Sequence, residues 1–397
     1  MLGLGSMVGA GVFVAIAPAA RAAGAGLLIG LGVAGAVAYC NANSSARLAA
    51  LYPESGGTYV YGRRRLGDFW GYLAGWAFVV GKLASCAAMA LTFGYYVAPA
   101  AARPLAAAAV AALTALNLGG VRKTAGAAKL LVAFVLAVLA LFVSAALAGG
   151  TVDTGHLTSV GHAGTFDVLR AAGFLFFAFA GYARIATLGE EVIEPERTIP
   201  RAIPIALGIA LAVYAAVAIA ALLALSPGRI AASSAPLHAV LEAGSLGSFA
   251  PAIQVGAAVA SLGVLVSLLA GVSRTVFAMA ANADLPRALA AVHARTRVPH
   301  IAEIAVGAVA LVIAATADIR GAIGFSSFCV LLYYAIANAS ALTLRGSRSA
   351  LAGVGLAGCL GLAFTLPLSS VLAGAAVIAT GTLVYAAFRL RRPAASL

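Results

Sequence analysis

Long stretches of apolar residues recur from one end of the chain to the other, and short polar segments separate them. A helix needs about twenty such residues to cross the apolar part of a bilayer. The stretches are continuous and do not alternate with polar residues, so they predict helices and not a β-barrel. Membrane-spanning helices are expected at residues 1–18, 24–51, 68–98, 105–118, 125–148, 166–192, 199–225, 249–282, 299–317, 319–344, 350–367 and 369–388.

Composition agrees with a membrane protein. Of 397 residues, 63% are hydrophobic and only 9% are charged, and the mean hydropathy is +1.05. A soluble chain of this length needs far more charge to cover its surface. The net charge of +13 is also typical of nucleic-acid binding, but the basic residues form short clusters between apolar segments. We therefore expect no nucleic acid as a partner.

The positions of the basic residues predict the orientation. With the N-terminus in the cytoplasm, 15 Lys and Arg fall in the inside segments and 5 in the outside loops. This asymmetry follows the positive-inside rule and favours about twelve helices with both termini cytoplasmic. Arg, Ala and Gly are abundant, which is typical of GC-rich bacterial genomes. The expected location is the inner or plasma membrane of a bacterium.

Two of the predicted helices contain a candidate break. The first carries GSMVGAG at residues 5–11, and each glycine weakens a helix by about 1 kcal/mol relative to alanine. The alternative is close helix packing through the Gly5 and Gly9 pair. The sixth carries FFAFAGYAR at residues 176–184, where the alternative is plain aromatic packing.

The spacing of the two breaks indicates a transport site. They lie five helices apart, as two inverted five-helix repeats would place them, and substrates bind where such broken helices meet. The broken ends offer N–H groups to a carboxylate and carbonyl groups to an ammonium. An amino acid carries both groups.

Four motifs together carry a family resemblance. They are GSMVGAGVF at residues 5–13, YPESGGTYVY at 52–61 with GYLAGW at 71–76, the segment 176–200, and SRTVFAMA at 273–280. In this order they resemble the amino acid–polyamine–organocation transporter superfamily, with its leucine-transporter-like fold.

This resemblance implies an all-α integral membrane protein with about 12 transmembrane helices. Residues 1–148 are expected to form the first repeat, 166–345 the inverted second repeat, and 350–390 two appended helices. The implied activity is secondary active transport of amino acids or related amines by alternating access, and not an enzymatic reaction. No cofactor is expected. The implied partners are the substrate, the lipid bilayer and protons.

The resemblance also implies where the substrate binds. The carboxylate is expected at the unwound first helix and the amine at the carbonyls of the sixth. Phe177 matches the position of an aromatic gate over the substrate, and Phe179 is a second candidate for it. The first helix is expected to be truncated, because only four residues precede its break. The implied binding residues are Gly5, Ser6, Met7, Val8, Gly9, Ala10, Gly11, Phe177, Ala178, Phe179, Ala180 and Gly181.

Two lysines are unusual for a membrane interior. Lys129 lies one turn into the fifth helix, where sodium-independent members of the superfamily carry a lysine. We expect it to be buried and to couple transport to protons or to support sodium-independent exchange, the alternative being that it snorkels to the surface. Lys82 lies near the middle of the third helix, about 21 Å from its start. It is the candidate specificity residue and favours a neutral or acidic substrate, unless it only pairs with helix carbonyls.

Other functions stay open. A polyamine or organic-cation exchanger of the same fold is the main alternative, and a membrane sensor or channel is less favoured. Arg184 with Glu190 and Glu191 is a candidate cytoplasmic gate. The five histidines lack ligand spacing and the four cysteines are scattered, so no metal site is predicted. Acidic residues inside the helices are nearly absent, which argues against a membrane-embedded transferase.

Overall fold

The computed structural model describes residues 7, 9–52, 54, 56–120, 125–150, 152–158, 160–182, 195–344 and 349–390, and in these residues all regular structure is helical. The α-helices are α2 (Gly11–Ala23), α3 (Leu27–Leu51), α4 (Thr58–Leu66), α5 (Asp68–Val97), α6 (Ala102–Leu118), α7 (Ala125–Ala148), α8 (Thr165–Phe179), α10 (Pro195–Ala224), α11 (Pro227–Ala232), α12 (Pro236–Glu242), α13 (Ala250–Ala281), α14 (His300–Thr316), α15 (Ile319–Leu342), α16 (Ser349–Thr365) and α17 (Leu368–Leu390).

The membrane character of the fold is confirmed. Each predicted span overlaps a described helix, in the order α2, α3, α5, α6, α7, α8, α10, α13, α14, α15, α16 and α17. Eight helical segments of the described chain are long and apolar enough to cross a bilayer, and α14 and α16 are shorter apolar helices. Large apolar side chains are exposed on several of these helices, as a surface that faces lipid requires; examples are Leu130, Ile205 and Leu383.

Some predicted boundaries are wrong. The first helix was expected to end at Pro18, but α2 contains this proline and continues to Ala23. The sixth helix was expected to break within residues 176–184, where α8 ends at Phe179 and a 3₁₀ turn follows at Ala180–Tyr182; its expected end at residue 192 lies outside the described residues. The short helix α4 was not predicted. It lies between Gly57 and Gly67, which both have positive φ and so favour glycine at the two ends.

Helices that are five spans apart pack against each other. Thus α2 packs on α8, α3 on α10, α5 on α13, and α6 on α14. The fifth and tenth spans also occupy matching places, because α7 packs on α10 and α13 while α15 packs on α3 and α5. The two five-helix sets therefore make corresponding contacts.

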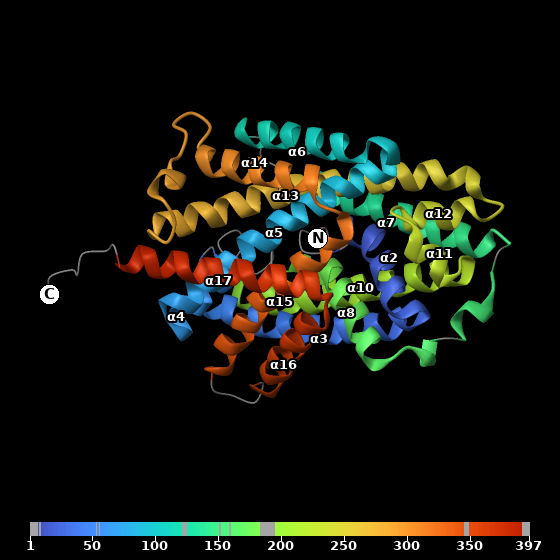
Figure 1. The fold of residues 1–397 in the computed structure, drawn as a ribbon, viewed down its shortest axis with the longest axis horizontal. Coiled ribbons are helices and arrows are strands. Elements are labelled where there is room, and N and C mark those ends of the chain that lie inside the picture. The colour runs from blue at the N-terminus through green and yellow to red at the C-terminus, as the bar shows by residue number, and fades with distance from the viewer. Residues whose placement is uncertain are drawn as a thin grey trace.

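Two helices occupy the centre of this bundle. In α5 and in α15, 83% of the most apolar window is buried, whereas in α17 only 17% is buried. Figure 1 shows α6, α13 and α14 along one edge and α3 and α16 along the opposite edge, with α5 crossing between them. The helices α2 and α8 lie in the interior, next to α3.

Candidate functional site

The first helix begins where the sixth helix ends, and the two touch at one glycine. A Cβ atom placed on Gly11 would lie 2.8 Å from the Cα of Ala178, which is closer than real Cβ atoms approach. Gly11 begins α2, and Ala178 lies in the last turn of α8. Both are buried. A glycine is therefore required at residue 11 for this contact between the helix ends.

One hydroxyl group connects the backbones of the two helices. The Tyr214 hydroxyl of α10 donates to the carbonyl oxygen of Met7 and lies 3.1 Å from that of Ala178. The ring of Phe179 packs on Tyr214 with 5.1 Å between centroids and fixes its position. A tyrosine hydroxyl carries one proton, so it cannot fully satisfy both carbonyls at once. The two carbonyls therefore share one hydroxyl proton, and the Met7 carbonyl also accepts from the Gly9 N–H at 2.7 Å.

A second set of donors lies at the end of α8. The Lys82 Nζ of α5 is 3.4 Å from the carbonyl oxygen of Ala180, and the Tyr334 hydroxyl of α15 is 3.5 Å from the same oxygen. Both distances are long for hydrogen bonds. Lys82 is only 6% exposed. The partial negative charge at the C-terminal end of α8 favours a cation at this place.

The structure brings most of the predicted binding residues together. Met7, Gly9, Ala10, Gly11, Ala178, Phe179 and Ala180 are buried, and Phe177 and Gly181 are half-buried. Gly5, Ser6 and Val8 lie outside the described residues. Phe179 is held against Tyr214, whereas the role of Phe177 as an aromatic gate stays a prediction.

The expected burial of Lys129 is wrong. Its side chain is exposed, because it lies about one turn after the start of α7, on the same outward side as Leu130. Its role in coupling stays a prediction that burial no longer supports.

A buried carboxylate was missed by the sequence analysis. Glu303 of α14 is 2% exposed and accepts a hydrogen bond of 2.8 Å from the Asn117 amide of α6. The Ser273 hydroxyl of α13 donates to its other oxygen. The only sequence signal was an acidic residue four positions after Pro299 at the start of an apolar helix, which is also what an ordinary first helical turn contains.

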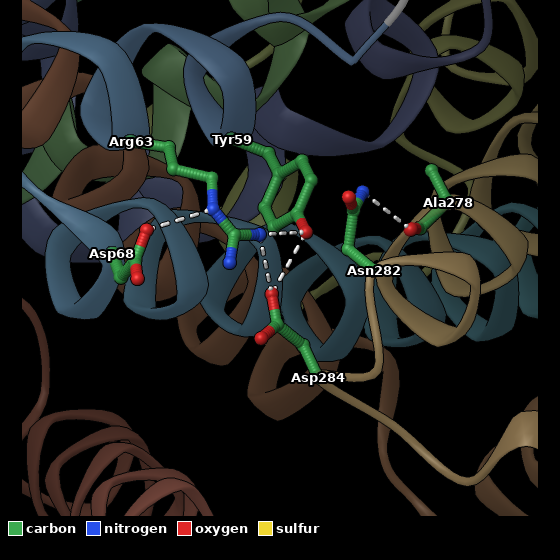
Figure 2. A network of polar contacts seen from close by, with 6 residues as sticks. All are labelled: Tyr59, Arg63, Asp68, Ala278, Asn282 and Asp284. Carbon is green, nitrogen blue, oxygen red and sulfur yellow. Dashed lines mark hydrogen bonds and ion pairs between the residues drawn. The ribbon is translucent and has the colours of Figure 1, made fainter. Parts of the chain in front are cut away.

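A polar network joins α4 to the end of α13, and Figure 2 shows its geometry. Asp284 Oδ2 accepts from the Tyr59 hydroxyl at 2.8 Å and from Arg63 Nη1 at 2.9 Å. Arg63 Nε also pairs with Asp68 at 3.0 Å. Burial and the hydrogen bond to Asp284 raise the pKa of Tyr59. Tyr59 therefore stays protonated and remains a donor at neutral pH.

The sequence analysis did not predict this network, and the gate that it did predict stays a prediction. Arg184, Glu190 and Glu191, the predicted cytoplasmic gate, lie outside the described residues. Asp284 reaches Arg63 because the turn after α13 closes with a backbone bond of 2.8 Å from its N–H to the Met279 carbonyl. That turn places Ala283 at a φ of 57°, a conformation that alanine adopts at a cost. Nothing in the local sequence marks such a turn.

Metal binding has no support in the described part of the chain. There, no three His, Cys, Asp or Glu residues are grouped so that they could hold an ion. The four cysteines are buried free thiols.

Comparison with known proteins shows which family these features belong to. The family model described as "Amino acid permease" matches residues 1–390. A protein of Mycobacterium tuberculosis named "Uncharacterized transporter" is 61% identical over 394 residues, which are 98% of this chain and 90% of that protein.

More distant relatives have more specific names. The "Branched-chain amino acid permease" of Bacillus subtilis is 24% identical over 76% of this chain and 70% of its own length. The human "Cationic amino acid transporter 4" is 28% identical over 88% of this chain and 59% of its own length. With a family model that covers nearly its whole length, the chain belongs to the amino acid permease family.

Proposed function

We propose that this protein is a secondary active transporter that moves amino acids across a bacterial cell membrane by alternating access. Its helices would cross the membrane twelve times, with both termini cytoplasmic. The first ten would form two inverted repeats, residues 1–148 and 166–345. The matching contacts of helices five spans apart support this arrangement. Residues 350–390 would be appended to it.

One observation carries the proposal: the start of α2 and the end of α8 meet in the interior, with three carbonyl groups gathered at their junction. The carbonyl oxygens of Met7, Ala178 and Ala180 have the donors Tyr214, Lys82 and Tyr334 as neighbours. A substrate ammonium would bind at the carbonyls of Met7 and Ala178, because Lys82 already lies at that of Ala180. The substrate carboxylate would bind the free N–H groups where α2 begins.

Lys82 favours a neutral or acidic substrate over a cationic one. Its ammonium group lies at the Ala180 carbonyl, in an interior where like charges repel strongly. A second positive charge on a substrate side chain would meet this repulsion, whereas a carboxylate would be attracted. Relatives named for branched-chain and for cationic amino acids both exist, so the names alone do not decide. The position of Lys82 makes a polyamine exchanger the weaker alternative.

Alternating access needs a closure on each side of the site. On one side, α11 and α12 pack on α2, and the Tyr96 hydroxyl joins them by donating to the Phe13 carbonyl at 2.8 Å and accepting from Leu237 N at 3.3 Å. On the other side, the Tyr59, Arg63 and Asp284 network joins α4 to the end of α13 (Figure 2). We propose that these contacts are the outer and the cytoplasmic closure.

Uptake into proteoliposomes tests this function. Purified protein is first screened for thermal stabilisation against all amino acids and polyamines, because a ligand at a hundredfold excess over its Kd contributes about 2.7 kcal/mol. Each hit is then tested for counterflow, in which unlabelled substrate loaded inside the vesicles exchanges for labelled substrate from the outside solution. Saturable counterflow of a neutral or acidic amino acid is expected. Stabilisation without counterflow would favour a sensor, and non-saturable flux a channel.

A further inference from the structure

The buried carboxylate of Glu303 has no role in the substrate site described above. Its two hydrogen-bond donors, Asn117 and Ser273, are neutral. Within the residues that the structure describes, Glu303 takes part in no ion pair. This differs from the other buried acid, Asp284, which pairs with Arg63. Glu303 is therefore a buried carboxylate whose described partners are both neutral.

The donor set suits a proton better than a metal ion. Asn117 presents its amide nitrogen, and Ser273 its hydroxyl, to the two carboxylate oxygens. Both groups donate, so the carboxylate oxygens already face hydrogen atoms and not open space. A sodium ion would need several oxygen ligands in place of these donors. Protonation needs only that one donor turns away or becomes an acceptor, which a serine hydroxyl does by rotation.

Glu303 lies between the substrate site and an exposed loop. The Cys86 thiol of α5 is within electrostatic range of both Glu303 and Lys82, and Lys82 reaches the Ala180 carbonyl. In the other direction, His300 lies one turn before Glu303 and on the same side of α14, and its Nδ1 is buried without a hydrogen-bond partner among the described atoms. Val292, in the loop before α14, is 49% exposed.

Four described elements pack on α14, which carries Glu303: α5, α6, α13 and η8 (Arg287–Ala290). Lys82 is the one buried basic side chain among them. The other titratable side chains differ in burial. Cys86 is buried like Lys82, His300 of α14 itself is half-buried, and Arg103, Arg274 and Arg287 are exposed. The remaining titratable side chains of α5 are Asp68, Tyr72, Tyr95 and Tyr96. Among the described side chains of these elements, Lys82 is therefore the one buried base near Glu303.

We propose that Glu303 is the proton-binding site that couples this transporter to the proton gradient. This inference rests on the proposed transport function. Glu303 joins α14 to Asn117 of α6 and Ser273 of α13, and a proton on Glu303 changes one of these hydrogen bonds. Because α13 also packs on α5, which carries Lys82, the packing of these helices then depends on the proton. Substrate binding that favours one packing of these helices therefore affects proton binding, and proton binding affects substrate binding equally. The proton passes between the exposed loop and Glu303 by way of His300.

Glu303→Gln in proteoliposomes tests the proposal. The variant keeps the shape of the side chain and cannot carry the proton. We expect counterflow exchange to persist, while accumulation driven by an imposed pH gradient falls at least tenfold. Glu242→Gln, at a 63% exposed carboxylate on α12, is the matched control and should keep both activities. Lys129→Met is tested alongside, because loss of pH-driven accumulation in it alone would assign coupling to Lys129 and overturn the proposal.

The outcomes separate this inference from the transport function itself. Absence of counterflow for every amino acid in the wild-type protein would refute transport. Counterflow with full pH-driven accumulation in Glu303→Gln, or accumulation driven by sodium, would refute the role of Glu303 alone. If the variant does not fold, wild-type protein is treated with dicyclohexylcarbodiimide, which modifies protonated carboxyl groups in apolar surroundings. Modification of Glu303 that abolishes pH-driven accumulation supports the proposal, and unchanged accumulation or modification elsewhere refutes it.

Discussion

The Tyr214 hydroxyl contacts the backbone at both helix breaks. It donates to Met7 and lies within hydrogen-bond distance of Ala178, and both carbonyls are buried with it. Leaving a buried acceptor unsatisfied costs about 1–3 kcal/mol. The stability of the helix ends and the geometry of the substrate site therefore depend on the same atom.

We predict that Tyr214→Phe lowers the apparent melting temperature in detergent and reduces counterflow at least severalfold. Tyr39→Phe removes the same hydroxyl from a side chain that is 45% exposed on α3, and should change neither quantity. Equal behaviour of the two variants would show that Tyr214 does not hold the helix ends together.

Lys82 sets the charge of the proposed site. Lys82→Met keeps a long apolar side chain and removes the ammonium from the Ala180 carbonyl. We expect arginine and lysine to compete with the transported substrate at least tenfold more strongly in this variant. Competition assays in proteoliposomes measure this directly. An unchanged ranking of competitors in Lys82→Met would contradict the assignment of Lys82 to specificity.

The residue scale is also where prediction from sequence was least reliable. Residues 5–11 and 177–181 were recognised because glycine and aromatic patterns mark a helix break, and the described members do meet. Lys129 was expected to be buried and Glu303 was not identified, and the reason is the same for both. Each lies near a helix end, where the sequence does not show which way a side chain faces. Lys129 faces outward and Glu303 is buried between three helices.

At the scale of elements, the short helix α4 joins helices that are distant in sequence. The Thr58 N–H donates to the Tyr333 hydroxyl of α15 at 3.1 Å, and Arg65 reaches the Thr343 carbonyl at 2.6 Å. Tyr59 and Arg63 bind Asp284 after α13. A small cavity beside these contacts is lined by Gly56, Tyr59, Gly75, Phe78, Thr275 and Tyr333. These contacts make α4 suited to the closure that we propose on this side of the site.

Asp284→Asn should weaken this closure. The side chain of Asp284 is 3% exposed, and breaking a buried ion pair costs about 3–5 kcal/mol. We expect a lower melting temperature and several-fold faster labelling of a cysteine placed by Thr275→Cys. Asp68→Asn removes the other carboxylate that binds Arg63, but its side chain is 46% exposed, so a loss of at most about 1 kcal/mol is expected. Similar labelling rates in the two variants would argue against a closure at Asp284.

The helix order was predictable, and the contacts of α4 were not. Apolar stretches of span length mark the membrane helices directly, so every predicted span overlaps an observed helix. In contrast, α4 has only nine residues and is held by side chains from α13 and α15, which no local pattern reveals. The end of α8 at Phe179 falls within the predicted break at residues 176–184, which its glycine and aromatic pattern marks.

At the scale of the whole molecule, three proposed sites lie along α5 and its neighbours. The ends of α2 and α8 are the proposed substrate site, the α4 network is the proposed closure on one side, and Glu303, between α6, α13 and α14, is the proposed proton site. Their arrangement follows from the packing of each helix on the one five spans away, with α5 in the centre (Figure 1). One set of packed helices thereby carries the proposed sites of binding, closure and proton coupling.

The most direct test of the central claim is substrate protection at the junction of α2 and α8. A cysteine is introduced by Gly181→Cys, which lies in the turn after α8, and a second by Val292→Cys in the exposed loop as the control. Labelling by a membrane-permeant maleimide is timed with and without the amino acid that shows counterflow, in variants that retain counterflow. We predict that substrate slows labelling at residue 181 at least fivefold and leaves labelling at residue 292 unchanged. Equal labelling rates at residue 181 with and without saturating substrate would contradict it.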